Sequence, residues 1–118
     1  EAMSSYLRLE KLENVLREEV SKIIDKDIDL PPGNLLTITR VTVSPDVHYA
    51  DVFVSILGED PKAVLEILRK SVYNIQQPLN KKIRRRPVPA IRFRLDEQEF
   101  RRERFERSLA KIKKNKEL

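Results

Sequence analysis

The sequence has no cysteine and no tryptophan, only two glycines and a single histidine. Without cysteine the chain can form neither disulfide bonds nor thiolate metal sites, which is usual for cytosolic proteins. Its two glycines, Gly33 and Gly58, cannot supply a Walker loop, a dinucleotide-binding fingerprint or the Gly-x-x-Gly clamp of many RNA-binding domains. The common loops that cradle phosphate are therefore excluded.

Catalytic residue patterns are also absent. His48 lies near Asp46 and Asp51, and the three could be interpreted as a metal or acid–base cluster. Alternation along a strand does not bring all three to one point, so we interpret His48 and Asp51 as exposed strand residues and Asp46 as a turn residue. Since there is neither a triad nor a pair of catalytic carboxylates, we expect a protein that is not an enzyme and has no metal or cofactor.

A chain of 118 residues is long enough for one domain with a modest core. No apolar run reaches the length of a membrane span, and no segment near the N-terminus resembles a signal peptide. We expect a monomeric cytoplasmic protein that does not contact membranes.

The net charge of +5 is divided unevenly along the chain. From Lys81 onward there are 15 Lys/Arg and 6 Asp/Glu, whereas residues 1–80 hold 9 Lys/Arg and 13 Asp/Glu. Such a polarised field favours a polyanion on one side of the molecule. Clustered Lys/Arg is typical of nucleic-acid-binding domains, and the alternative is a solvated surface with a basic tail.

Apolar residues at three- and four-residue steps predict an amphipathic helix over residues 5–26 and a helix–kink–helix over residues 61–85. Asp60 suits the N-cap of the latter and Pro61 its first position. Pro78 in a helix interior would cost about 3 kcal/mol. We therefore expect Asn74 to cap the second half, which would place Pro78 in its first turn.

The first predicted strand, residues 35–44, has an irregular apolar pattern. Leu36 and Ile38 share one face, whereas Val41 and Val43 fall on the other. A β-bulge around Thr39-Arg40 would place all four side chains on the core side. The alternative is a strand buried on both faces.

A Ser44-Pro45-Asp46 turn leads into a second strand, and a third spans Ala90 to Leu95. Alternation directs Arg92 and Arg94 of the third strand outward. The expected order is α-β-β-α-kink-α-β, an α+β fold whose three-stranded sheet is covered by helices. Residues 97–118 carry only a thin apolar stripe among many charges and predict a basic tail, helical or partly disordered.

Residues 43–55 follow the pattern V-S-P-D-x-x-x-A-x-V-F-V-S, which resembles the signature of the ribosome-binding factor A family. Residues 7–28, 51–58 and 88–96 are similar to the family's first helix, second strand and third strand. The resemblance implies a type II KH-like RNA-binding domain over residues 5–96, followed by the tail. It further implies a small-subunit assembly and maturation factor that binds 16S rRNA on the free or immature 30S subunit and promotes late rRNA maturation. The alternative is a protein-interaction module whose basic tail docks on an acidic partner.

The family commonly has Ala-x-Gly at its kink, where this chain has Ser71-Val72-Tyr73. Tyr73 could stack on an unpaired base or pack at the helix junction. Arginine suits phosphate because its planar fork donates two hydrogen bonds at once. The candidate RNA-binding residues are Ser71, Tyr73, Asn74, Lys81, Lys82, Arg84, Arg85, Arg86, Arg92 and Arg94.

Overall fold

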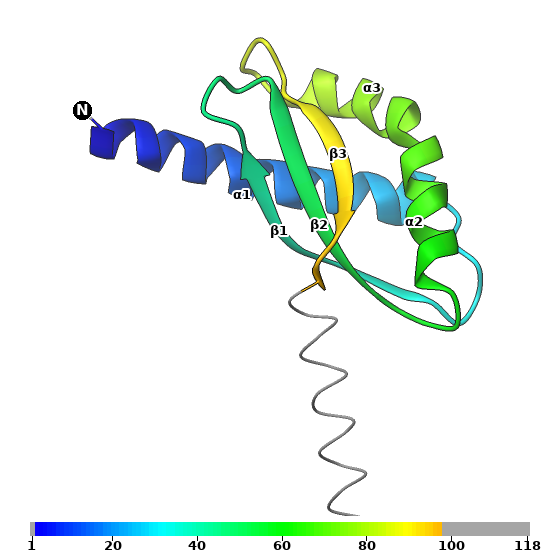
Figure 1. Ribbon diagram of the computed structural model, residues 1–118. Helices are drawn as coiled ribbons and strands as arrows, with labels where there is room; N and C mark the ends of the chain where they lie inside the picture. Colours follow the sequence, from blue (N-terminus) through cyan, green and yellow to red (C-terminus); the bar gives the residue numbers. More distant parts are fainter. Residues whose placement is uncertain (1, 98–118) are drawn as a thin grey trace, which may run out of the picture.

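Figure 1 shows the computed structural model, which describes residues 2–97. The predicted α+β fold and its order of elements are confirmed. The predicted tail, apart from Glu97, lies outside the described residues. The elements are α1 (Ala2–Asp27), β1 (Leu35–Val43), β2 (Tyr49–Leu57), α2 (Pro61–Lys70), α3 (Val72–Lys82) and β3 (Ala90–Leu95).

The sheet has the strand order β1-β2-β3, in which β2 pairs antiparallel with β1 and parallel with β3. A parallel neighbour requires a crossover, because the chain must return to the end of the sheet where the preceding strand began. The helices α2 and α3 provide that crossover. Consequently the loop after α3 lies at the same end of the sheet as the β1–β2 turn (Figure 1).

The predicted bulge in β1 is confirmed. The β1–β2 register shifts between Ile38 and Arg40, which leaves Thr39 without a partner in the ladder. Beyond the shift Val41 and Val43 are buried, while Ile38 before it packs against the same core. The extra residue therefore returns the apolar side chains to one face.

All three helices cover one face of the sheet, and Figure 1 looks onto the other face, with α1 passing behind the strands. Leu16 of α1, Leu68 of α2 and Ile75 of α3 are fully buried against Val52 and its neighbours on β2. Each such side chain contributes about 1.5–3 kcal/mol of transfer free energy. The second face, the open face, carries the outward residues of the strands and has no helix over it among residues 2–97.

The start of α2 and the helix–kink–helix order confirm the prediction, whereas the cap of the second helix corrects it. Asp60 is the N-cap, accepting a hydrogen bond from the Ala63 N–H at 3.1 Å, and Pro61 is the first helical residue. The break occurs at Ser71, whose hydroxyl donates to the Ile67 carbonyl oxygen at 2.7 Å. Asn74 lies inside α3, so the prediction that it caps this helix was wrong.

Pro78 also lies inside α3 rather than in its first turn. Proline cannot donate to the carbonyl four residues earlier, which here belongs to Asn74. Asn74 is exposed, so water can satisfy that carbonyl. Ile75 and Leu79, on either side of the proline, are fully buried, and their burial offsets the cost of the missing bond.

Side chains from the crossover helices close the free edge of β3. The Gln76 amide accepts from the Ile91 N–H at 3.0 Å and donates to the Pro89 carbonyl oxygen at 3.1 Å. Arg69 donates from Nη2 to the Phe93 carbonyl oxygen at 3.4 Å. Gln76 thus makes two bonds that a fourth strand would otherwise make, which protects an exposed strand edge.

Replacing Gln76 with Ala should lower the free energy of unfolding by about 1–3 kcal/mol, because a buried N–H and a buried carbonyl lose their partners. Urea unfolding followed by circular dichroism measures the change. Gln77→Ala is the matched control, since Gln77 is exposed on the same helix. Equal destabilisation by the two substitutions would show that the edge bonds contribute nothing.

Candidate nucleic-acid interface

Two loops meet at one end of the sheet, the β1–β2 turn and the loop from α3 to β3 (Figure 1). The Ala90 N–H donates to the His48 carbonyl oxygen at 2.9 Å, which holds the two loops together. Ile83 and Pro89 are buried and anchor the second loop at both ends. Between these anchors, residues 84–86 are three exposed arginines.

The three arginines are not equivalent. Arg86 donates from Nη1 to the carbonyl oxygens of Ile83 and Arg85, the latter at 3.0 Å. Its guanidinium therefore supports the loop itself. Within residues 2–97, Arg84 and Arg85 have no ion pair, and their donors are available to a ligand.

The last turn of α3 supplies two lysines with different surroundings. Lys82 Nζ lies 3.4 Å from Glu19 Oε2 and links α3 to α1. Lys81 is exposed and makes no ion pair with the described part of the chain. Arg84, Arg85 and Lys81 thus form the basic loop cluster, a group of cations whose charge is not neutralised by described residues.

The three RNA-binding candidates at the kink, Ser71, Tyr73 and Asn74, have separate roles. Ser71 ends α2, and its φ of −91° shows that the break needs no glycine-like conformation. Tyr73 is 72% exposed, so its interpretation as a packed junction aromatic was wrong. Asn74 is exposed on α3 beside Tyr73. The kink therefore presents an aromatic ring and an amide to solvent.

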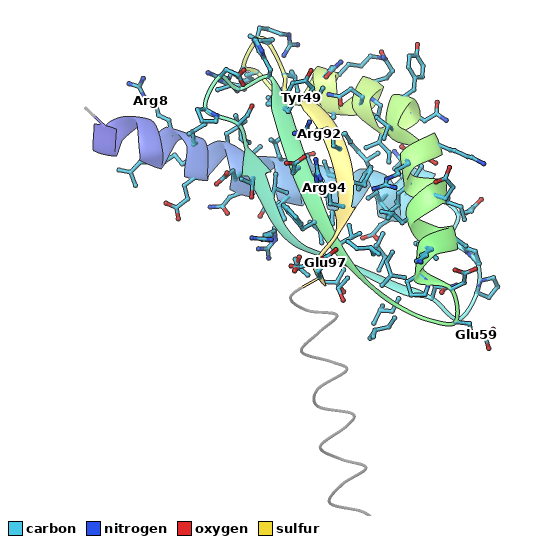
Figure 2. All side chains as sticks on the ribbon, viewed as in Figure 1. Arg8, Tyr49, Glu59, Arg92, Arg94 and Glu97 are labelled. Carbon is cyan, nitrogen blue, oxygen red and sulfur yellow. The ribbon has the colours of Figure 1, made fainter. Side chains whose placement is uncertain are left out.

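Arg92 and Arg94 project from the open face of β3, as predicted. Their Nε atoms lie 2.8 and 3.2 Å from Oδ1 of Asp51 on β2. The Arg92 guanidinium also lies over the Tyr49 ring, 4.4 Å from its centroid. Figure 2 shows Tyr49, Arg92 and Arg94 following one another down the open face. One carboxylate between two arginines leaves this row with an excess positive charge.

Two further arginines were missed from the sequence. The Arg40 guanidinium lies 4.0 Å from the centroid of the Phe53 ring, on the open face. Its outward direction follows from the bulge, so the shift in apolar phase could have identified it. Arg69 reaches β3 from α2, and no sequence pattern indicates how α2 packs against that strand.

The structure therefore distributes the ten candidates over three places, the basic loop end, the kink and the open face, rather than one site. Cations on such surfaces bind phosphate oxygens, which gives affinity and position more than base discrimination. No helix in residues 2–97 is long and apolar enough to cross a membrane.

The β1–β2 turn is a compact network next to the basic loop cluster. Oδ1 of Asp46 accepts from the Ser44 hydroxyl at 2.6 Å and from the His48 N–H at 3.2 Å. Val47 has a φ of 62°, which is rare for a β-branched residue, and its side chain packs against the core. These bonds and contacts hold a backbone conformation that costs about 1–3 kcal/mol.

The cluster considered from the sequence does not form. His48 Nδ1 lies 3.3 Å from Asp46 Oδ2, but Asp51 instead pairs with the two arginines of β3. Across the described range no group of three or more His, Cys, Asp or Glu side chains is placed to hold a metal ion.

Comparison with known proteins gives consistent matches. A family model described as "Ribosome-binding factor A" matches residues 8–109. Ribosome-binding factor A of Natranaerobius thermophilus is 39% identical over 95 residues, which cover 79% of this chain and 72% of the relative. The protein of the same name from Thermodesulfovibrio yellowstonii is 34% identical over 116 residues, covering 98% of both chains.

Solved structures agree with the sequence matches. The crystal structure of ribosome-binding factor A from Thermus thermophilus superposes with a TM-score of 0.66 at 25% identity, covering 74% of this chain and 94% of that one. A homology model of the Thermus thermophilus protein, as fitted into the cryo-EM map of a complex with the 30S subunit, gives a TM-score of 0.62 at 26% identity, covering 71% of this chain and 90% of that one.

The turn network makes a pH prediction. The Ser44 hydroxyl, and after it the His48 N–H, hold the pKa of Asp46 below its usual range. The folded state thus favours the carboxylate form of Asp46. The stability that results is fully present above the ordinary pKa of aspartate, and it is lost as the pH falls through the pKa of Asp46 in the folded state. The pKa of Asp46, measured from its carboxyl carbon by NMR, should rise in Ser44→Ala and stay unchanged in Thr42→Ala. Equal values in wild type and Ser44→Ala would contradict the assignment.

Proposed function

Because the chain belongs to the ribosome-binding factor A family, we propose that it binds the small ribosomal subunit and assists its assembly. The Thermus thermophilus coordinates fitted into a map of a 30S complex support the same partner here. The RNA bound is 16S rRNA on the free or immature subunit, and the step assisted is late rRNA maturation.

The observation that carries the proposal is the basic loop cluster. Arg84 and Arg85 stand on a loop whose ends are buried at Ile83 and Pro89. A loop anchored in this way presents its charges in a fixed place, so little conformational freedom is lost on binding. Phosphate oxygens of rRNA match the planar donors of these two side chains.

The kink adds a second kind of contact. Tyr73 is the second residue of α3. Its side chain is 72% exposed and can stack on an unpaired base. Ser71 cannot offer its hydroxyl proton as readily, because that group already donates to the Ile67 carbonyl. Tyr73 and Asn74 are therefore the kink residues that contact RNA.

The mechanism is binding rather than bond making. Counter-charge and shape stabilise one conformation of the rRNA, and the protein changes no covalent bond. It acts as a cytoplasmic monomer without a cofactor. The rival function, docking of the basic tail on an acidic protein, differs in that binding would survive removal of the RNA by ribonuclease.

The double substitution Arg84→Ala/Arg85→Ala should weaken binding to purified small subunits and flatten its salt dependence. The slope of log K against log salt concentration is negative, and each lost phosphate contact reduces its magnitude by about 0.7–0.9. Co-sedimentation at several salt concentrations between about 50 and 200 mM measures both the affinity and its dependence on salt.

Arg8→Ala/Arg17→Ala is the control with the same change in net charge. Both residues are exposed on α1, where Figure 2 labels Arg8 near the N-terminus, and neither belongs to the loop between α3 and β3. If the two double variants bind with the same affinity and slope, the cluster is not the contact surface.

A further inference from the structure

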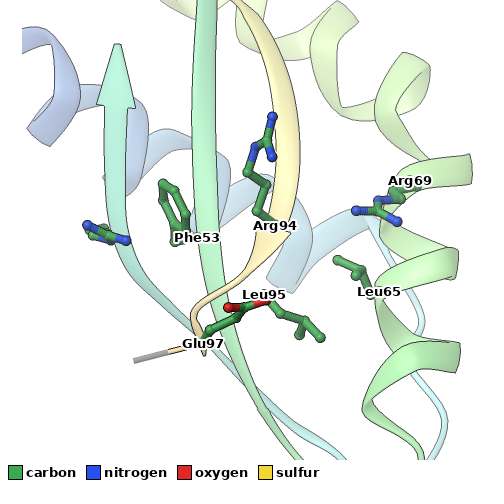
Figure 3. A pocket seen from close by; sticks show the side chains of 7 residues that line it. Phe53, Leu65, Arg69, Arg94, Leu95 and Glu97 are labelled. Atoms are coloured by element: carbon green, nitrogen blue, oxygen red, sulfur yellow. The ribbon is translucent and has the colours of Figure 1, made fainter. Parts of the chain in front are cut away.

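A hollow of about 560 Å³ opens where β3 ends, at the opposite end of the sheet from the basic loop cluster. Figure 3 shows its lining side chains arriving from both the open face and α2, with Glu97 at its rim. The other lining residues are Arg40, Phe53, Leu65, Arg69, Arg94 and Leu95.

Three of the lining residues are arginines from three different elements. Arg40 comes from β1, Arg69 from α2 and Arg94 from β3. Their polar contacts include Asp96 at 3.8 Å, the Phe93 carbonyl oxygen at 3.4 Å and Asp51 at 3.2 Å, respectively. A guanidinium has five N–H donors, so one such contact leaves donors for a ligand. Glu97 is the one carboxylate among the lining residues, so three guanidinium groups outnumber it and the hollow is suited to an anionic group.

The other lining side chains, apart from Glu97, are aromatic or apolar. Phe53 is half-buried, and the Arg40 guanidinium lies 4.0 Å from its ring centroid. Nucleic-acid bases stack on aromatic side chains and on guanidinium planes. Leu65 and Leu95 complete the apolar lining. A ligand that carries both a flat ring and an anion matches this combination.

We propose that the hollow binds one unpaired nucleotide of a single-stranded RNA segment. The base stacks against the Arg40–Phe53 pair, and Arg69 and Arg94 bind the adjacent phosphate. This assignment rests on the proposed function, since it names a second RNA contact of the same protein. Single-stranded RNA is required because bases within an A-form duplex are not free to stack on protein side chains.

The position of the hollow fits one continuous RNA segment. Tyr49 pairs with Ala90 at the loop end of the β2–β3 ladder, and Phe53 pairs with Arg94 near its far end. Four residues along a strand span about 13 Å. RNA held at the basic loop cluster can thus run along the Arg92–Arg94 row to the hollow.

The first test compares two neighbouring arginines of β3, one that lines the hollow and one that lies outside it. Arg94 and Arg92 both project from β3, are about half-exposed and pair with Asp51, but only Arg94 lines the hollow. Fluorescence anisotropy of the full chain with a labelled oligouridylate should show about tenfold weaker binding for Arg94→Ala. Arg92→Ala should weaken binding less, by about twofold to threefold, because Arg92 adds charge to the row but does not line the hollow.

The second test separates stacking from charge. Phe53→Leu removes a ring and keeps an apolar side chain, so oligouridylate affinity should fall about tenfold without a change in salt slope. Tyr49→Leu is its control, because Tyr49 also carries a stacked arginine on β2 but lies outside the hollow. Thermal unfolding of each variant verifies that it is folded, and ultraviolet cross-linking should attach uridine to the peptide that contains Phe53.

Equal losses in Arg94→Ala and Arg92→Ala, or in Phe53→Leu and Tyr49→Leu, would overturn the assignment. So would unchanged oligouridylate affinity combined with lost small-subunit binding, which would make the open face a contact for a protein.

The two proposals can fail separately. If Arg84→Ala/Arg85→Ala weakens subunit binding but the hollow variants bind RNA normally, only the hollow is refuted. If the hollow variants lose RNA and the chain does not bind subunits, the proposed function is refuted.

Discussion

The parallel pairing of β3 with β2 is the constraint on which the rest of this structure depends. It obliges the chain to cross the sheet through α2 and α3, and it returns the loop that follows α3 to the β1–β2 turn. The same pairing places Arg92 and Arg94 opposite Asp51 and Phe53. A different pairing of β3 would separate the loop arginines from the turn and remove the row of arginines from the open face.

Covering one face of the sheet with all three helices leaves the other face to be kept soluble by its own side chains. Aromatic rings on that face are covered by arginines, Tyr49 by Arg92 and Phe53 by Arg40. Stacked guanidinium groups shield a ring from water while remaining charged and hydrated at their edges. The arrangement that makes the face soluble is thus also one that can bind nucleic acid.

Much of the fold could be predicted because strand patterns are local. The slip in apolar phase around Thr39 located the bulge, and Asp60-Pro61 located the start of α2. The resemblance placed the kink at Ser71-Val72-Tyr73, where α2 and α3 do meet, but the start of the second helix was misplaced at Asn74, because burial of Ile75 and Leu79 keeps Pro78 inside a helix against its intrinsic preference. Tertiary packing often overrides local propensity in this way.

The candidate site was predictable in composition but not in detail. Arginine clustering identified the basic loop, yet it gave no sign that Arg86 bonds its own loop or that Lys82 pairs with Glu19. Arg69 was missed because its place depends on the packing of α2 on β3. Charge in a sequence therefore indicates a class of partner, whereas the structure distinguishes the cations that are free from those that support the fold.

The central claim, binding to the small ribosomal subunit through RNA, is tested most directly by sedimentation of cell lysate through a sucrose gradient with detection of this protein in each fraction. The account predicts enrichment with free small subunits or their precursors, lost after ribonuclease treatment. A protein that stays at the top of the gradient at low salt, or whose enrichment survives ribonuclease, would contradict it.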